Sequence, residues 1–316
     1  YYDVRQAEGI TKSGQFVIQW AKNAVNKWMN NLLQTNNVNY IIASDTDSLY
    51  INMEFLVNKF FPNEQDKNRI INAINKICKE KINLVLNQSF KELADYINAY
   101  ENKMDMKREV ICDRALWTGK KYYALSVWDS EGVRFKEPKI KVKGMKGIKS
   151  STPAKARKAF KKVMEVALTQ DEAAVQKVVS DFEDEFFTMP PLEMALPSGI
   201  SDVDKFMNEN GDPVLRTPVH CRGAIMYNKA LKKFGLEKKY SDIKNGFKIK
   251  YLYLKEPNPV ESYVISFPDD TIPEELGIEK YIDKQKMYMN AFYKSVDDVM
   301  KVVNWETTKV SDGIFC

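Results

Sequence analysis

Residues able to bind soft or borderline metal ions are scarce in this sequence of 316 residues. It contains one histidine, His220, and four widely separated cysteines without a CxxC pair. This spacing argues against a structural zinc site and against a disulfide framework, and it fits a reducing compartment. The single histidine likewise argues against nucleophilic catalysis that depends on a histidine base.

Long apolar stretches are also missing. No run of about 18 or more apolar residues occurs, which excludes a membrane-spanning helix, so we expect no membrane partner. The opening YYDVRQAEGI lacks the basic and then apolar pattern of a secretory signal, which favours a cytoplasmic location. Because the sequence does not begin with methionine, we expect a fragment, a processed product or a trimmed chain.

The net charge is only +5, but the charge is distributed unevenly. Residues 103–162 contain 18 Lys and Arg against 6 Asp and Glu, a local excess of 12 positive charges. Such a segment favours a polyanionic partner, and a solvated lysine-rich face is the alternative. Aromatic residues interleave with these charges: Trp117, Tyr122, Tyr123, Trp128 and Phe135.

The apolar pattern predicts an α+β protein. Apolar residues at three- and four-residue spacing predict helices, and two apolar runs around a short polar turn predict a hairpin with an acidic tip. A boundary is expected at 147–153, where Ser-Ser-Thr-Pro could cap a helix that starts near Ala154. The expected helices are 14–33, 68–99, 154–168, 171–187 and 274–303; the hairpin is 38–53; β-rich segments cover 107–143, and irregular chain with strands covers 189–267.

The tip of the expected hairpin reads Asp45-Thr46-Asp47-Ser48 between two apolar strands. Two carboxylates beside apolar strands are unfavourable unless a cation or a basic side chain neutralises them. Oxygen ligands without histidine or cysteine suit Mg²⁺, which completes its shell with water and substrate phosphate. The alternative is a polar turn in which both carboxylates bond local backbone amides.

Several motifs resemble those of family B DNA polymerases, in the order found in the replicative enzymes of T-even-type bacteriophages. YIIASDTDSLYI is similar to the second carboxylate motif, usually YGDTDS, on the palm hairpin. WTGKKYYAL at 117–125 is similar to the KKxY motif, which follows the primer strand. The opening YYDVRQAEGITKSGQ, KSSTP at 149–153 and PVHCRG at 218–223 resemble further palm and thumb segments, so the resemblance covers essentially the whole chain.

This resemblance implies an antiparallel palm sheet that carries the DTDS hairpin and is flanked by long helices, followed by a mainly helical thumb. It assigns residues 1–148 to the C-terminal part of the palm and 149–316 to the thumb and tail. The implied reaction is template-directed nucleotidyl transfer from a dNTP to primer–template DNA with two Mg²⁺ ions.

The resemblance implies a role for each motif residue. Asp47 becomes the direct metal ligand, and Asp45 adjusts the metal or the primer end. Glu109 matches an outer metal-binding carboxylate, and a surface glutamate paired with a neighbouring base is the alternative. Ser44 replaces the usual glycine and adds a side chain close to the nucleotide site, where Ser48 completes the motif.

Phosphate contacts are implied for the basic and aromatic residues that follow. Lys121 takes part in catalysis and, with Tyr123, faces the primer strand, while Asp129 closes the next turn. Sheet packing is the alternative for the tyrosines, and a packed or capping residue is the alternative for the histidine. The implied DNA-binding residues are Lys120, Lys121, Tyr122, Tyr123, Lys146, Lys149, His220 and Arg222.

Other catalytic motifs of the family are absent from this sequence: the first carboxylate motif, the fingers helix with its triphosphate-binding lysine, and the exonuclease motifs. We therefore expect the C-terminal part of a polymerase, inactive alone and completed by an N-terminal polymerase chain in an infected bacterium. The alternative is a non-catalytic DNA-binding or clamp-tethering module with a vestigial carboxylate pair. A metal-dependent nuclease is disfavoured because no further acidic cluster accompanies the pair.

The C-terminal tail resembles loosely the peptide by which such phage polymerases bind a sliding clamp. Ser311 would supply the polar position, and Ile314 and Phe315 would supply the apolar anchor. A frayed terminus, or one that packs back on the thumb, is the alternative.

Overall fold

Residues 3–268 and 271–307 are described by the computed structural model, and their contacts divide the chain into two units. The first unit comprises Tyr1–Asp113 and Val127–Lys139, and the second comprises Arg114–Ser126 and Ile140–Cys316. Each unit has its own hydrophobic core. No helix in these described ranges is both long and apolar enough to cross a membrane.

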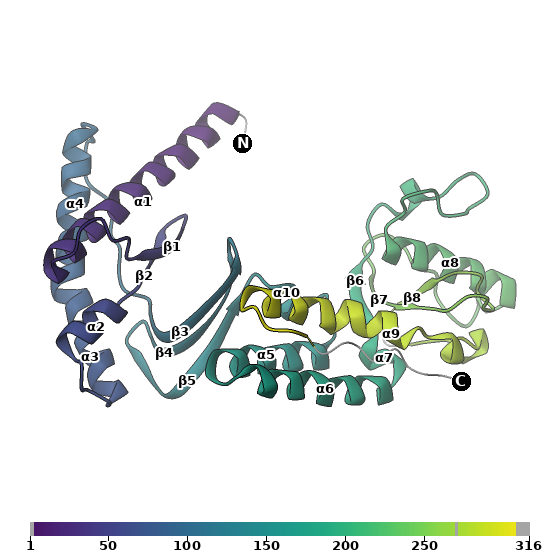
Figure 1. Ribbon diagram of the computed structural model, residues 1–316. Helices are drawn as coiled ribbons and strands as arrows, with labels where there is room; N and C mark the ends of the chain where they lie inside the picture. Colours follow the sequence, from purple (N-terminus) through teal and green to yellow (C-terminus); the bar gives the residue numbers. More distant parts are fainter. Residues whose placement is uncertain (1–2, 269–270, 308–316) are drawn as a thin grey trace. The chain divides into compact units, whose positions relative to one another are not determined.

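Helix α1 (Val4–Leu33) belongs to the first unit, and in Figure 1 its N-terminal part extends beyond the other elements of that unit. The Asp3 side chain caps it by accepting a hydrogen bond from the Arg5 backbone N–H, so the helix starts earlier than the predicted Gly14. Its buried stripe packs against α4 (Asn83–Tyr96). The stripe has the three- and four-residue spacing that predicted the helix: Ile18, Ala21, Val25, Met29 and Leu33.

The helix predicted over 68–99 is confirmed in three consecutive parts. These are α3 (Lys67–Ile77), the π-helical turn η1 (Cys78–Ile82) and α4. The π-turn inserts one wider turn and leaves the buried stripe on the same core, with both Cys78 and Ile82 buried.

The acidic hairpin is confirmed as β1 (Ile41–Asp45) and β2 (Ser48–Ile51), followed by α2 (Glu54–Phe60). It forms a two-stranded sheet of its own, whereas the resemblance placed it on a larger palm sheet. Its strands are short, five and four residues, and they pack against α1.

A separate three-stranded sheet confirms the strands expected over 107–143. It consists of β3 (Val110–Gly119), β4 (Tyr122–Ser130) and β5 (Val133–Lys143) in that order. Two-residue connections join the neighbouring strands, which makes the sheet antiparallel. The division into two units falls within each of these strands, so the sheet belongs to both.

In the second unit, α5 (Ala154–Thr169) and α6 (Glu172–Thr188) lie side by side and confirm the two predicted helices (Figure 1). The predicted Ser-Ser-Thr-Pro cap is wrong in its chemistry. Pro153 is the N-cap residue, and the Thr152 hydroxyl donates to the Lys146 carbonyl instead of accepting from the helix. This bond ties the start of α5 to the turn η2 (Lys146–Ile148).

The second unit also contains a sheet, and apart from Pro268 its strands lie within the stretch 189–267 for which strands were expected. Strands β6 (Leu196–Gly199), β7 (Lys248–Tyr253) and β8 (Val264–Pro268) pair antiparallel after the short helix α7 (Pro191–Met194). Helix α8 (Val219–Phe234) packs on β8. Gly223 permits this close contact, because a Cβ there would lie 2.4 Å from the Ser266 Oγ.

The helix predicted over 274–303 begins later, at Lys284. It consists of α9 (Lys284–Tyr288), the π-helical turn η6 (Met289–Tyr293) and α10 (Lys294–Val302). The preceding residues form two separate 3₁₀ turns, Glu274–Leu276 and Glu279–Tyr281. Gly277, with φ of 59°, ends the first turn, so the periodic pattern is interrupted. The α+β class is confirmed.

Candidate functional site

The turn between β1 and β2 holds two acidic residues in a strained backbone. Asp45 pairs with Ser48 at the end of the ladder, so Thr46 and Asp47 form the connection. Thr46 has φ of 45°, and the Asp47 backbone N–H donates to the Asp45 carbonyl at 2.5 Å, which closes a γ-turn. A β-branched residue rarely adopts positive φ, and such strain clusters at functional sites.

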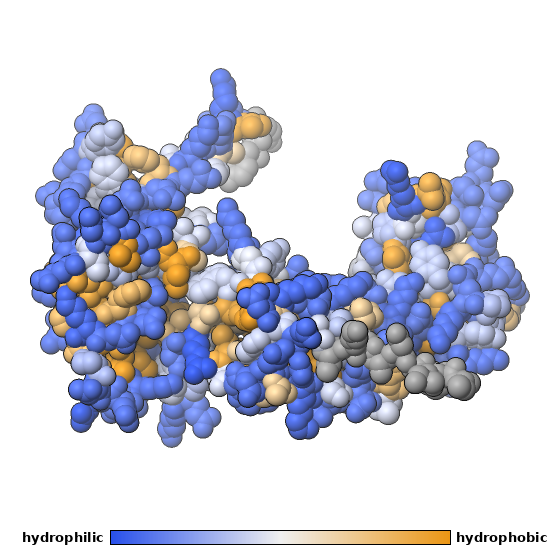
Figure 2. All heavy atoms as spheres, viewed as in Figure 1, coloured by the Kyte–Doolittle hydropathy of each residue, from blue (hydrophilic) through white to orange (hydrophobic). Residues whose placement is uncertain are grey.

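A β-bulge precedes this turn. The register of β1 shifts between Ile41 and Ala43, which leaves Ile42 as an extra, exposed residue. Bulges re-aim the side chains that follow them, here the end of β1 with Asp45. Phe55 and Phe60 of α2 are also exposed, and Figure 2 shows hydrophobic side chains among the hydrophilic ones on this unit.

The two carboxylates of the turn have different surroundings. Asp45 is partly buried, and its Oδ1 accepts a hydrogen bond from the Thr46 Oγ1 at 3.1 Å. The Asp47 side chain is exposed and makes no hydrogen bond or ion pair with the described residues. Its oxygen lone pairs are therefore available to a hard cation such as Mg²⁺, whose preference for carboxylate oxygen this pair fits.

The other residues predicted near the metal are Ser44, Ser48 and Glu109, and each has a different environment. Ser44 is partly buried opposite Leu49, and the Ser48 Oγ donates to the Asp45 carbonyl at 3.2 Å. Glu109 is exposed before β3, and its carbonyl accepts from the Glu131 N–H at 2.6 Å. Within the part of the chain that the structure describes, no three His, Cys, Asp or Glu residues are grouped to hold a metal.

Asp129 lies at the centre of a buried polar cluster in the first unit. Its side chain is 3% exposed and pairs with Arg108, whose side chain is 9% exposed, and with Arg134 at 3.3 Å. The two arginines also donate to Asn68, Asn72 and Asn75 of α3. The sequence identified Asp129 as structural but gave no signal for these partners. Arg108 is 21 positions away in the sequence, and the other partners lie on other elements, β5 and α3.

The ionisation of Asp129 follows from its partners. Burial opposes the charged form, but hydrogen bonds from Arg108 and from the Gly132 backbone N–H outweigh it. Together with the Arg108 charge they hold the pKa of Asp129 below its usual value. The cluster therefore keeps a carboxylate charged inside the protein and ties β4 to α3.

The connection between β3 and β4, in the second unit, carries the two lysines of the KKxY motif, and the two tyrosines begin β4. Lys120 and Lys121 are the two residues of this connection, both exposed, and Lys121 has φ of 69°. Alternation then separates the tyrosines, as predicted: Tyr122 is 45% exposed, whereas Tyr123 is 6% exposed. The Tyr123 ring lies 6.1 Å from that of Trp117, so Tyr122 is the tyrosine that reaches solvent, whereas the resemblance placed Tyr123 at the primer strand.

The lysines after this turn are exposed and unpaired. Lys143, Lys146 and Lys149, like Lys120, form no ion pair with any residue in the ranges described. Elsewhere in this unit some exposed lysines have acidic partners, such as Asp181 for Lys177, and others, such as Lys232 and Lys248, have no ion pair in the described chain. The positive charge near the KKxY turn is thus available to an external anion.

His220 and Arg222 occupy the first turn of α8. Burial lowers the pKa of the His220 imidazole, which is consequently neutral near pH 7. Arg222 donates from Nη2 to the Val214 carbonyl at 3.3 Å and stacks over the Tyr263 ring, 5.6 Å from its centroid. These contacts favour a structural role for Arg222 over a DNA contact.

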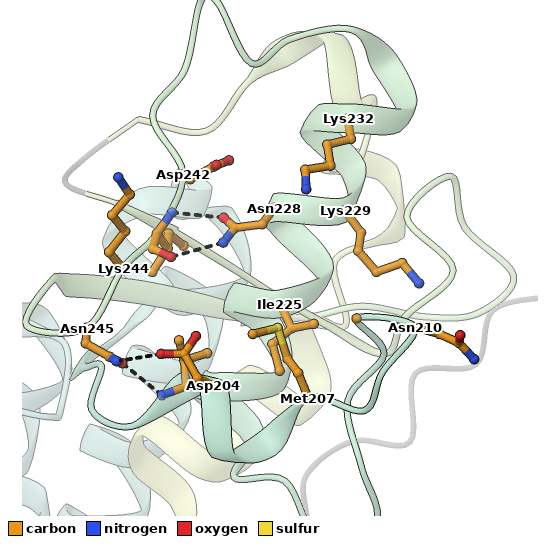
Figure 3. A pocket seen from close by; sticks show the side chains of 13 residues that line it. Asp204, Met207, Asn210, Ile225, Asn228, Lys229, Lys232, Asp242, Lys244 and Asn245 are labelled. Carbon is orange, nitrogen blue, oxygen red and sulfur yellow. Dashed lines mark hydrogen bonds between the residues drawn. The ribbon is translucent and has the colours of Figure 1, made fainter.

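An open pocket of about 720 Å³ lies between α8 and the loops beside it (Figure 3). None of the predicted site residues lines it. Two of its amide side chains are used internally: Asn228 exchanges two hydrogen bonds with the Ile243 backbone, and Asn245 donates to Asp204 at 3.1 Å. Lys229 pairs with Asp212, and the buried Oδ1 of Asp242 has no hydrogen-bond partner among the described residues.

The predicted clamp-binding residues Ser311, Ile314 and Phe315 lie outside the described residues.

Comparison with known proteins gives consistent matches. The family described as "Divergent Family B DNA polymerase" matches residues 30–182. The chain is 32% identical over 306 residues to the DNA-directed DNA polymerase of Enterobacteria phage T4, and 33% identical over 280 residues to that of Escherichia phage RB69. These matches cover 93% and 86% of this chain but only 34% and 31% of the two relatives.

Proposed function

Because this chain is a relative of the family B DNA polymerases of phages T4 and RB69 and spans about a third of their length, we propose that it is the C-terminal palm and thumb part of a replicative polymerase. Its reaction is template-directed nucleotidyl transfer from dNTP to primer–template DNA. The observation that carries this proposal is the acidic turn, in which Asp47 offers a free carboxylate beside the positioned carboxylate of Asp45.

In this proposal the two carboxylates divide the work of holding Mg²⁺. Asp47, exposed and without a protein partner in the described chain, is the direct ligand. Asp45, held by Thr46, orients the turn and the primer end. When bound, Mg²⁺ would favour loss of the primer 3′-hydroxyl proton and neutralise the charge that develops on the triphosphate. Glu109 is proposed as an outer carboxylate that adds negative charge near the metal.

The Lys120–Lys121 turn and the lysines that follow β5 bind the DNA backbone in this proposal. Lys121 and Tyr122 contact the primer strand, and Lys120, Lys146 and Lys149 extend the contact along the phosphates. Tyr122 takes the place expected for Tyr123, because Tyr123 is only 6% exposed. Phosphate contacts do not read sequence, which suits an enzyme that copies any template. The absence of ion pairs at the last three of these lysines within the described ranges supports the assignment, since no acidic side chain must be displaced.

An N-terminal polymerase part, on the same polypeptide or on a separate one, completes the proposed enzyme. It carries the first catalytic carboxylate motif, the fingers and the exonuclease, which have no counterpart in this sequence. The site of action is the cytoplasm of an infected bacterium, and the tail residues Ser311, Ile314 and Phe315 are the proposed contact to a sliding clamp. If the carboxylates were vestigial, the chain would instead be a DNA-binding or clamp-tethering module.

Primer extension by this chain together with a family B N-terminal chain tests the proposal. Asp47→Asn should reduce extension by at least about a thousandfold, because it removes a metal ligand, while primer–template affinity stays within about twofold. Asp45→Asn should be milder. Asp184→Asn, which changes an exposed carboxylate on α6, is the matched control and should extend normally. Wild-type extension by both turn variants would show that the turn is vestigial.

A further inference from the structure

Gly144 follows the last residue of β5 and touches the KKxY turn through backbone alone. A Cβ at this position would lie 2.3 Å from the Lys121 carbonyl oxygen and 2.7 Å from the Tyr122 Cδ1. Both distances are shorter than any Cβ contact in a folded protein allows, and the first involves a backbone atom that cannot rotate away. Gly144 also has φ of 76°, which favours glycine by itself.

The turn that Gly144 touches is short. Only Lys120 and Lys121 join β3 to β4, and Lys121 is held at φ of 69°. An isolated two-residue turn with such a backbone can relax in several ways, so a neighbouring backbone in direct contact restricts it.

The segment that carries Gly144 is, by contrast, firmly anchored. Met145 is buried in the core of the second unit, and Gly147 lies against the Phe160 ring, where a Cβ would be 2.4 Å from its Cγ. The Lys146 carbonyl accepts from the buried Thr152 hydroxyl at 2.9 Å. A side chain at residue 144 would therefore displace the turn rather than its own segment.

We propose that Gly144 is a positioning residue that sets where the Lys120–Lys121 turn presents Lys121 and Tyr122 to the DNA backbone. The packing of the turn on Gly144 is a property of the chain alone, whereas the DNA contact rests on the proposed function. The two parts of this inference therefore need separate measurements.

Amide hydrogen exchange of the isolated chain tests the packing. Gly144→Ala is compared with Gly132→Ala, whose φ of 91° gives a similar backbone penalty but which has no atom within 4 Å of its Cβ position. We expect exchange at Tyr122 and Tyr123 to rise about tenfold in the first variant and to stay unchanged in the second. Equal exchange in both variants would overturn the proposal.

DNA binding at several salt concentrations tests the consequence. Gly144→Ala should weaken primer–template binding several-fold, and in combination with Lys121→Ala it should add little, because both changes act through one contact. Full additivity would mean that Gly144 does not act through Lys121 and would also overturn the proposal. If Lys121→Ala alone leaves binding unchanged, the DNA contact of this turn is wrong, and the exchange data still decide the packing.

A second variant covers the case in which Gly144→Ala does not fold, as judged by circular dichroism. Lys120→Gly, at the turn residue that does not have positive φ, loosens the same turn without adding any atom at residue 144. Faster exchange at the Gly144 amide is then expected, because the two backbones support each other. Unchanged exchange at that amide would overturn the proposal.

Discussion

Asp129 shows how a single residue depends on partners that sequence spacing cannot reveal. The motif predicted a structural role near the site, and the structure supplies Arg108 and Arg134 as counter-charges. The same limit applies to the tyrosines: alternation predicted opposite faces, but only the contact with Trp117 shows that Tyr123 is the buried one. The sequence motifs predicted which residues have a role, whereas only the folded structure shows which residues they contact.

Asp129→Ala should lower the free energy of unfolding by about 3–5 kcal/mol, because it leaves the buried Arg108 guanidinium without a counter-charge. Urea unfolding measures this loss, and Arg134→Ala, whose side chain is more exposed, should cost less. Since the pKa of Asp129 is lowered in the folded state, the stabilisation is present above about pH 4 and is lost as the pH falls further. A variant as stable as wild type at neutral pH would contradict this account.

His220→Gln should change how stability depends on pH. Burial lowers the pKa of His220 in the folded protein, so the unfolded chain takes up the proton first, near pH 6.5. Wild type should therefore lose stability relative to the variant between pH 7.5 and pH 5.5, as measured by urea unfolding at both values. If the free energies of unfolding of wild type and variant differ by the same amount at both pH values, the imidazole is not held neutral.

At the scale of elements, regular periodicity located the helices and strands well, and irregular backbone caused the differences. The hairpin and both helices of the second unit's helical pair lie where their apolar patterns placed them. The helix expected from residue 274 starts at Lys284 because Gly277 interrupts it. The strained turn at Thr46 had no signal in the sequence, since threonine disfavours the positive φ that it adopts.

Gly147→Ala tests the contact between η2 and α5. The Phe160 ring is buried and cannot move out of the way, so the added methyl group should lower stability by about 1–3 kcal/mol. Gly199→Ala, at an exposed strand position with no atom within 4 Å, is the control. Adding Phe160→Leu to Gly147→Ala should cost less than the sum of the single changes in chemical unfolding. If the losses of stability of the two single variants simply add in the double variant, the proposed contact between residue 147 and the Phe160 ring is wrong.

Across the whole molecule, the arrangement of paired and unpaired lysines is more informative than the net charge. The sequence predicted an anion-binding segment from a local excess of positive charge. The structure distinguishes its exposed lysines that have no ion pair in the described chain, such as Lys143, from those held by acidic neighbours, such as Lys155 with Glu193. Whether a lysine forms an ion pair depends on which elements meet in the fold. Composition alone therefore could not separate an anion-binding segment from a solvated lysine-rich face.

Replacing four unpaired lysines should reduce the salt dependence of DNA binding. Each lost phosphate contact lowers the slope of log affinity against log salt by about 0.9, so the fourfold alanine variant should lose about three to four. A variant of four ion-paired lysines changes the net charge equally and should keep the slope. The first set is Lys120, Lys143, Lys146 and Lys149, and the control set is Lys177, Lys205, Lys233 and Lys301. Equal slopes would show that the unpaired lysines are only solvated.

The sheet that the two units share governs how this chain can be made and divided. The chain enters the second unit at Arg114, returns to the first at Val127 and leaves it again after Lys139. On the ribosome, the first unit therefore lacks part of its sheet until that last segment has emerged, when a piece of the second unit is already present. No single cut of the polypeptide separates the units intact, because a break at any position divides at least one of them.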